Sequence, residues 1–159
     1  MGACRSGVQL DVVYMHDYMA TMQDDFSRCL LLNTRMAARA VTRRYDRELR
    51  PFGVTAAQFT ILSTMSTRPG QSVTDLAKSI AMDRTTLSRN LDLLERKRLI
   101  AGRDAEKGNG RLVSLSEEGA ALVPKLLPVW RGLQSEMNAL LGGDAMNALI
   151  AGLQRLPQI

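Results

Sequence analysis

Hydroxyl and guanidinium side chains gather in the segment 80–100, which reads IAMDRTTLSRNLDLLERKRLI. Leu87, Leu91 and Leu94 are spaced four and three residues apart, so they share one face of a helix. The other face carries the side chains that could do chemistry: Arg84, Thr85, Thr86, Ser88 and Arg89. Guanidinium groups form paired hydrogen bonds with guanine edges, whereas hydroxyls bind phosphate oxygens or contact thymine methyl groups. The segment therefore predicts a helix whose first turns bind nucleic acid.

Two acidic residues, Asp92 and Glu95, lie on the same helix. Phosphate would repel a carboxylate so close to it unless a cation neutralised that charge. We therefore expect both acids to be structural and to pair with Arg89 or Arg96.

The residues that precede this helix carry the signals that position it. Asp83 is its expected N-cap, and Ser72 is the expected N-cap of a shorter helix before it. Only Ala81 and Met82 then remain to connect the two helices. The shorter helix has an apolar stripe formed by Leu76, Ala77 and Ile80. Two helices joined by so tight a turn are typical of a helix-turn-helix, whose second member is the recognition helix.

A β hairpin is expected directly after the recognition helix. Residues 101–110 read AGRDAEKGNG, a loop rich in glycine and charge, and RLVSLS alternates as a strand. A hairpin in this place is a wing. Its candidate contacts to the DNA backbone or minor groove are Lys107, Asn109 and Arg111.

Long apolar helices are predicted on both sides of this unit. The first runs from about Asp24 to Arg50, with Pro51 and Gly53 after it, and Thr55 with Gln58 forms a capping box for the next helix. After Ser116 the apolar positions repeat every three and four residues, at Val123, Leu126, Trp130, Leu133, Met137 and Leu140. We expect Pro124 and Pro128 to bend or interrupt this helix, and Asp144 to cap a final one. The combined apolar surface of these flanking helices exceeds what so small a unit can cover, which predicts a homodimer. The alternative is that the helices fold back over the core of a single chain.

The charge and composition narrow the class of protein. A chain of 159 residues is one domain, or one domain with arms, and its formal net charge is +5. Between Arg68 and Arg111 there are ten Lys and Arg against six Asp and Glu, so most of the excess lies around the predicted recognition helix and wing. No apolar run is long enough for a membrane span, and no secretory signal pattern is present. A reducing cytoplasm is the expected compartment.

Catalytic and metal-binding patterns are missing from the sequence. It has no G-x-S-x-G, H-E-x-x-H or P-loop motif, and His16 is the only histidine. The two cysteines, Cys4 and Cys29, form no C-x-x-C. We therefore expect no enzyme, no metal site and no cofactor.

In its order of elements and in three stretches, the chain resembles the MarR family of winged helix-turn-helix regulators. The stretches are RAVTRRYDRELRPFGVTAAQFTIL, SVTDLAKSIAMDRTTLSRNLDLLERKRLI and RLVSLSEEG. The last is similar to the LT-x-x-G ending of the family's wing, with Ser116 in place of threonine. The wing departs from the family pattern, because Lys107 and Gly108 stand where an Asp-Arg pair is common, so Lys107 or Arg111 would have to supply the usual arginine contact.

The resemblance implies a mainly α (α+β) fold, with a winged helix-turn-helix DNA-binding lobe between dimerisation helices. The expected parts are a loosely ordered arm over 1–23, a dimerisation helix over 24–54, the DNA-binding domain over 55–115 and C-terminal dimerisation helices over 116–159. The implied function is a transcriptional regulator, expected to be a repressor, that binds pseudo-palindromic operators as a homodimer. A small aromatic or phenolic carboxylate is the implied effector that releases it from DNA.

Two further sites are suggested by the first helix. An arginine ridge at Arg35, Arg39, Arg43, Arg47 and Arg50 could bind an anionic effector, with Arg39 and Arg43 as the candidates, or be a solvated face paired with Asp46 and Glu48. Cys29 lies near the position of the reactive thiol in a peroxide-sensing branch of the family. A redox sensor acting through Cys29 is therefore the alternative function, set against a cysteine that is merely buried.

Overall fold

The computed structural model describes residues 26–104 and 111–156. The chain forms two compact units, residues 1–40 and 41–159, which are treated separately below. The predicted arm over 1–23 lies outside the described residues, as do Lys107 and Asn109.

The first unit contains a short 3-10 helix, η1 (Phe26–Arg28), and the beginning of α2 (Leu30–Leu49). The expected helix start near Asp24 is therefore wrong, because α2 begins only at Leu30. The amide of Asn33 donates to the carbonyls of Ser27 at 2.7 Å and Cys29 at 2.8 Å, which stabilises a separate turn before the helix. Phe26 and Leu30 are 69% and 61% exposed.

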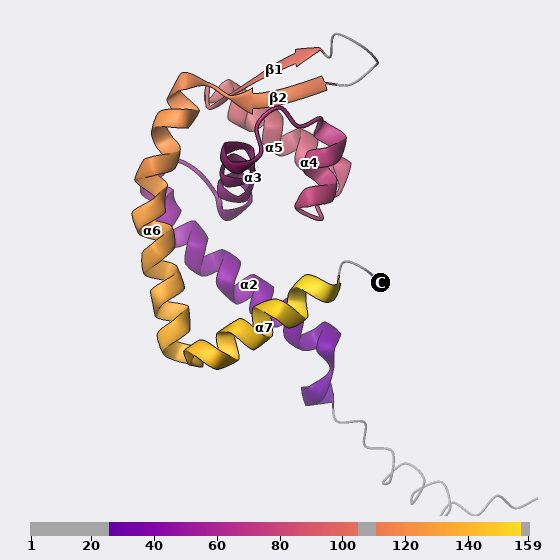
Figure 1. Cartoon of the computed structure of the whole chain (residues 1–159), viewed down its shortest axis with the longest axis vertical. Helices are drawn as coiled ribbons and strands as arrows, with labels where there is room; N and C mark the ends of the chain where they lie inside the picture. The colour runs from indigo at the N-terminus through magenta and orange to yellow at the C-terminus, as the bar shows by residue number, and fades with distance from the viewer. Residues whose placement is uncertain (1–25, 105–110, 157–159) are drawn as a thin grey trace, which may run out of the picture. The chain divides into compact units, whose positions relative to one another are not determined.

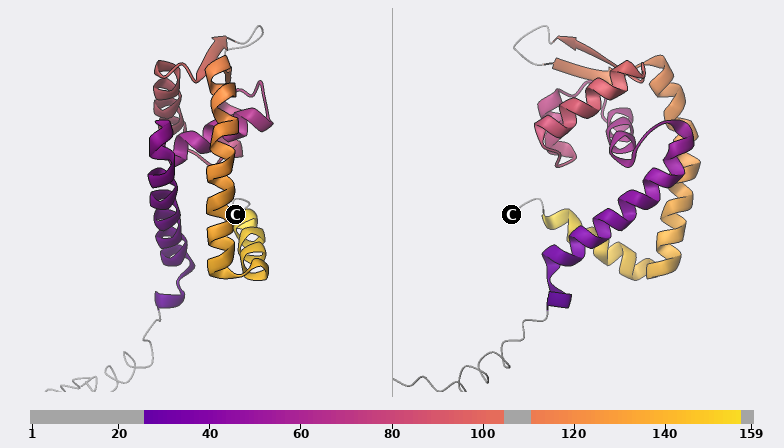
Figure 2. Two further views of the ribbon diagram at one scale, coloured as in Figure 1. Left: turned by 90° about the vertical axis from the view of Figure 1, so that its left-hand side faces the viewer. Right: turned by 180° about the vertical axis from the view of Figure 1, so that it is seen from behind.

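The second unit contains the predicted helix-turn-helix and wing (Figure 1). After the end of α2 its elements are η2 (Arg50–Phe52), α3 (Ala56–Thr67), α4 (Val73–Ser79), α5 (Arg84–Arg96), β1 (Ile100–Asp104), β2 (Arg111–Leu115), α6 (Glu117–Leu141) and α7 (Gly143–Arg155). The two views of Figure 2 show α3, α4 and α5 grouped beside the β1–β2 hairpin, from which the long α6 departs. The mainly helical winged fold is thus confirmed.

The helix starts of this unit follow the capping signals in the sequence. The Thr55 hydroxyl accepts from the Gln58 N–H at 3.2 Å, and the Gln58 side chain returns the bond to the Thr55 N–H at 3.3 Å. Ser72 accepts from the Asp75 N–H at 3.1 Å, and Asp83 accepts from the Thr86 N–H at 2.8 Å. Each cap satisfies a backbone donor that the first helical turn leaves unpaired, so the starts of α3, α4 and α5 are set by local residues.

One apolar core joins the elements of the second unit. Its fully buried side chains come from α2, α3, α4, α5, β2 and α6: Leu49, Ile61, Leu62, Leu76, Leu87, Leu91, Leu94, Val113 and Leu126. The predicted leucine face of α5 is therefore buried. Burial of each such side chain contributes about 1.5–3 kcal/mol, which makes this core the main restraint on the orientation of α5.

The wing is a two-stranded antiparallel sheet in which Ile100 pairs with Leu115 and Asp104 with Arg111. The first strand is longer than expected, because Ala101–Asp104 belong to β1 and not to the loop. At the end of β2, the Ser116 hydroxyl accepts from the Gly119 N–H at 3.0 Å and donates to the Arg98 carbonyl at 2.5 Å. A Cβ at Gly119 would lie 1.9 Å from the Leu99 carbonyl oxygen. The S-x-x-G ending thus lets α6 begin against the strand connection that precedes β1.

The expectation for Pro124 and Pro128 holds in part. Figure 1 shows α6 as one curved helix, and it continues through both prolines without interruption. Asp144 is not the cap of α7, because the left-handed φ of +82° at Gly142 reverses the chain and α7 begins at Gly143 without a side-chain cap. The apolar repeat of α6 is buried at Val123, Leu126 and Leu133, whereas Leu140 is 82% exposed.

We predict that Gly119→Ala destabilises the fold by about 1–3 kcal/mol or more, because the new methyl group meets a backbone carbonyl that cannot rotate away. Gly132→Ala in the same helix is the matched control, since nothing lies within 4 Å of its added Cβ. The control should be stabilised by about 0.5–1 kcal/mol. Urea unfolding of both variants at one protein concentration measures the difference, and equal midpoints would contradict the prediction.

Candidate nucleic-acid interface

The face of α5 opposite the leucines is exposed in the second unit. All five of its predicted contact residues are exposed: Arg84, Thr85, Thr86, Ser88 and Arg89. Within the described residues, Arg89 has no hydrogen bond or ion pair, so its five donors remain available. The arrangement can place one guanidinium and several hydroxyls against a polyanion.

The first turn of α5 is held by two polar contacts. The carboxylate of Asp83 accepts from the hydroxyl and the N–H of Thr86, and these bonds lower the pKa of Asp83 below its ordinary value of 3.8. The Arg84 guanidinium donates to the hydroxyl of Thr74 on α4. Arg84 therefore bridges the two helices of the helix-turn-helix, a role that the sequence did not reveal.

The turn between α4 and α5 has an unusual backbone. Ala81 adopts a left-handed φ of 50°, a conformation that glycine adopts more readily. The Met82 N–H donates to the Ala77 carbonyl at 3.0 Å, which closes the end of α4. Two residues are thereby enough to redirect the chain into α5.

The wing residue Arg111 is bonded to the recognition helix. Its guanidinium forms an ion pair with Glu95 of α5. The prediction that Glu95 pairs with Arg89 or Arg96 is therefore wrong, because the wing folds back to the second half of α5. No local spacing signals this contact, which joins residues 16 positions apart.

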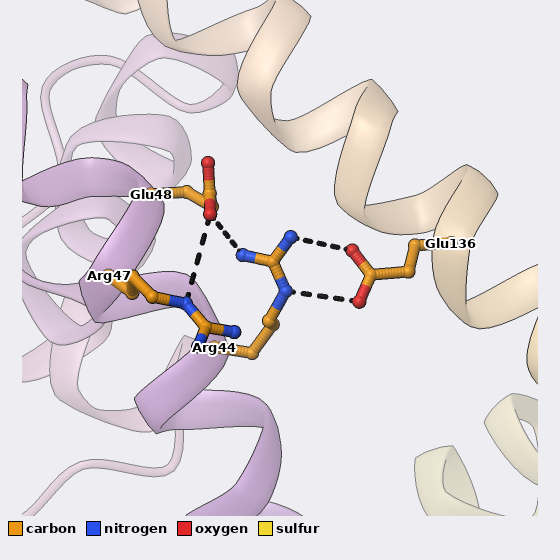
Figure 3. A network of polar contacts seen from close by, with 4 residues as sticks. All are labelled: Arg44, Arg47, Glu48 and Glu136. Carbon is orange, nitrogen blue, oxygen red and sulfur yellow. Dashed lines mark hydrogen bonds and ion pairs between the residues drawn. The ribbon is translucent and has the colours of Figure 1, made fainter.

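A second polar network ties α2 to α6 (Figure 3). The Arg44 guanidinium donates from Nε to Glu136 Oε1 at 3.0 Å and from Nη2 to Oε2 at 2.7 Å, and it also pairs with Glu48. The bonds to Glu136 raise the pKa of Arg44 and lower the pKa of Glu136. Such a bidentate pair fixes the angle between the two side chains as well as their distance.

An open cavity of about 410 Å³ lies beside this network. It is lined mainly by apolar side chains, among them Val41, Phe59 and Trp130, with Tyr45 and Thr42 as polar groups. The Tyr45 hydroxyl accepts from Gln134 Nε2 at 2.8 Å, and burial raises the pKa of Tyr45. The apolar lining can hold the ring of an aromatic molecule.

The arginine ridge does not line this cavity. Arg43 is exposed on α2 next to Thr42, and Arg39, also exposed, belongs to the first unit. Among the residues that the structure describes, the expected pairing with the nearby acids holds only for Arg47, whose Nε lies 3.9 Å from Glu48. Asp46 instead accepts from the Ala56 N–H at 2.7 Å and supports the start of α3.

Cys29 lies in the first unit at the junction of η1 and α2, and not on the helix as expected. It is a free, half-buried cysteine. Across residues 26–104 and 111–156, no helix is long and apolar enough to span a membrane. In the same ranges, histidine, cysteine and acidic side chains form no group of three that could hold a metal ion.

The chain is similar in sequence and in structure to known proteins. A family model described as MarR family matches residues 52–111. The M. tuberculosis transcriptional regulator MosR in complex with DNA is 34% identical, over 82% of this chain and 94% of that chain, with a TM-score of 0.74. A mutant of MarR from E. coli in complex with operator DNA is 26% identical, over 84% of this chain and 98% of that chain, with a TM-score of 0.73. Bordetella bronchiseptica BpsR, whose DNA binding is regulated by 6-hydroxynicotinic acid, has the same fold at 22% identity, with 84% and 97% of the two chains covered and a TM-score of 0.74.

We predict that Asp83→Asn removes a stabilising contribution that is present at neutral pH and disappears in acid. The folded state keeps Asp83 ionised to lower pH than the unfolded chain does, since its pKa is lowered from 3.8. The contribution is therefore complete above that value and lost as the pH falls through the lower folded pKa. Unfolding by urea between about pH 3 and pH 7 measures it.

Thr86→Val is the graded comparison for this prediction, because it removes only the side-chain donor to Asp83. Thr86→Val should change the pH dependence of the free energy of unfolding in the same direction as Asp83→Asn, but by a smaller amount. A stability difference between the wild type and Asp83→Asn that does not narrow below about pH 4 would contradict the assignment.

Proposed function

Because the chain belongs to the MarR family of DNA-binding, winged helix transcriptional regulators, we propose that it is a repressor that binds pseudo-palindromic operators as a homodimer. The observation that carries the proposal is the division of α5 into a buried leucine face and an exposed face with an unpaired Arg89. An N-terminal recognition face of this composition suits the major groove.

The proposed roles on DNA follow from the chemistry of each exposed group. Arg89 takes a guanine edge through two parallel hydrogen bonds, because its guanidinium has no other partner in the described residues. Thr85 and Ser88 take phosphate oxygens or thymine methyl groups. Lys107 and Asn109, which lie outside the described residues, are proposed to contact the flanking minor groove or backbone.

The proposed homodimer is supported by apolar side chains that the single chain leaves open. In the first unit these include Phe26, Leu31 and Met36, which are all more than half exposed. In the second unit they include Leu140 near the end of α6 and Leu149 in the middle of α7. A second copy would remove this surface from water, and its two-fold symmetry would match a palindromic site.

The proposed effector is an aromatic or phenolic carboxylate bound in the cavity lined by Tyr45 and Trp130. Support comes from the apolar lining. Arg43, which is exposed and follows the lining residue Thr42 in the sequence, is the proposed partner of the carboxylate. The cavity lies between α2, α3 and α6, and Tyr45 and Arg44 tie α2 to α6. A ligand there would lower DNA affinity only if it bound the two arrangements of these helices unequally.

We predict that Arg89→Ala weakens binding to the preferred DNA by roughly tenfold to a hundredfold, because a bidentate contact to one base is lost. The preferred DNA is obtained by letting the full chain select duplexes from a random library, and fluorescence anisotropy at physiological salt measures the affinity. Binding to scrambled DNA should change far less.

Arg131→Ala on α6 is the matched control, since Arg131 is an equally exposed arginine away from α5. It should keep the wild-type preference. If no sequence is enriched by selection, or if Arg89→Ala keeps the preference as well as Arg131→Ala does, the proposed readout is wrong.

We predict that aromatic acids change the fluorescence of Trp130, which is the only tryptophan of the chain and lines the cavity. Salicylate serves as the probe, titrated with and without bound DNA. Ala57→Leu should weaken its binding by narrowing the cavity, whereas Ala121→Leu, which lies in a different groove, should leave it unchanged. A saturating signal that ignores Ala57→Leu would place the ligand elsewhere.

A further inference from the structure

Arg111 sits at the loop end of the wing and faces inward. It begins β2 and pairs in register with Asp104 of β1, while the buried Val113 follows two residues later on the same strand. Side chains two residues apart in a strand point to the same face of the sheet, so Arg111 shares the face of Val113, which lies in the core. That face is the one directed at α5, where Glu95 receives the guanidinium.

The missing side chain of Gly102 makes room for this ion pair. A Cβ at Gly102 would lie 2.6 Å from Arg111 Nε and 2.8 Å from Glu95 Oε1. The pair therefore crosses the surface of β1 at the one strand position that has no side chain to obstruct it. Glu95 and Arg111 are 28% and 43% exposed, so the contact is partly shielded from water.

Glu95 also lies on the side of α5 that carries Ser88, one helical repeat of seven residues earlier. An unpaired carboxylate there would repel approaching phosphate groups. Its pairing with Arg111 cancels that charge and, in the same contact, ties the wing to the recognition helix.

We propose that Arg111 is a positioning residue and not a DNA contact: with Glu95 it fastens the loop end of the wing to α5, so that the recognition helix sets where the wing meets DNA. This inference rests on the proposed function and replaces the contact expected of Arg111 from the sequence. Its rival is an Arg111 that leaves Glu95 and binds a phosphate when DNA arrives.

The two roles make opposite predictions for salt dependence. A phosphate contact contributes about one unit to the slope of log affinity against log salt concentration. Arg111→Gln should therefore leave the slope unchanged if Arg111 only positions the wing. If the ion pair positions the wing, Glu95→Gln should weaken binding to the preferred DNA, because it breaks that pair. If Arg111 were instead a phosphate ligand, Glu95→Gln would strengthen binding to every DNA, because it removes a negative charge.

The experiment measures the affinity of the full chain for the selected duplex and for scrambled DNA across salt concentrations. For Glu95→Gln, Arg111→Gln and the double variant, we expect a similar loss of about fivefold in preference, because residues of one pair do not act additively. The exchanged pair, Glu95→Arg with Arg111→Glu, should recover part of the preference. Thermal unfolding of these variants should stay close to the wild type, since an exposed pair adds little stability.

Gly102→Ala offers an independent test of the same pair. Its methyl group meets only the ends of flexible side chains, so the fold should survive while the pair is displaced. Gly102→Ala should lower the preference for the selected duplex as Glu95→Gln and Arg111→Gln do. Combined with both of these substitutions, it should cause no further loss. Arg131→Gln is the control for a lost surface charge.

A slope that falls by about one in Arg111→Gln would overturn the proposal, as would an unchanged preference in both single variants. The salt dependence of binding to scrambled DNA distinguishes the two roles of Arg111 even if the wild type prefers no sequence, because a phosphate contact would contribute to that slope as well. Failure of the proposed operator readout is thus separable from failure of this inference.

Discussion

The recognition helix α5 is oriented by one buried face, made of Leu87, Leu91 and Leu94. None of the three is more than 1% exposed, and they share the core with Leu62 and Leu126. A rotation of α5 about its axis would expose this face at a cost of about 1.5–3 kcal/mol for each side chain. The polar face with Arg89 is therefore turned outward as a consequence of core packing, and the capping bonds of Asp83 decide where along the chain that face begins.

The wing is restrained at its two ends by close contacts of different kinds. At its base, Gly119 allows α6 to approach the Leu99 carbonyl, and Ser116 bonds to the Arg98 carbonyl. At its loop end, Gly102 leaves space for the pair of Arg111 and Glu95. Steric approach at one end and charge at the other thus restrain the hairpin.

Polar contacts hold α2 and α6 in their relative orientation, whereas apolar packing orients α5. Arg44 holds Glu136 through two hydrogen bonds, and Gln134 donates to Tyr45, which also lines the cavity. Exposed ion pairs contribute little to the free energy of unfolding, but a bidentate pair restricts geometry. A network of this kind can break and re-form at small cost, which suits helices whose arrangement an effector is proposed to change.

The sequence alone determined where α3, α4 and α5 begin and which face of α5 is apolar. Capping signals at Thr55, Ser72 and Asp83, together with apolar repeats of three and four residues, act between near neighbours and are visible without a structure. Tertiary structure decided the partners of Glu95, Glu136 and Arg84, because these contacts join positions 10 to 92 residues apart. It also decided that α6 continues through its two prolines and that α7 begins at Gly143. Local signals fix where a helix starts and which side is apolar, whereas long-range pairs exist only once the core has brought distant segments together.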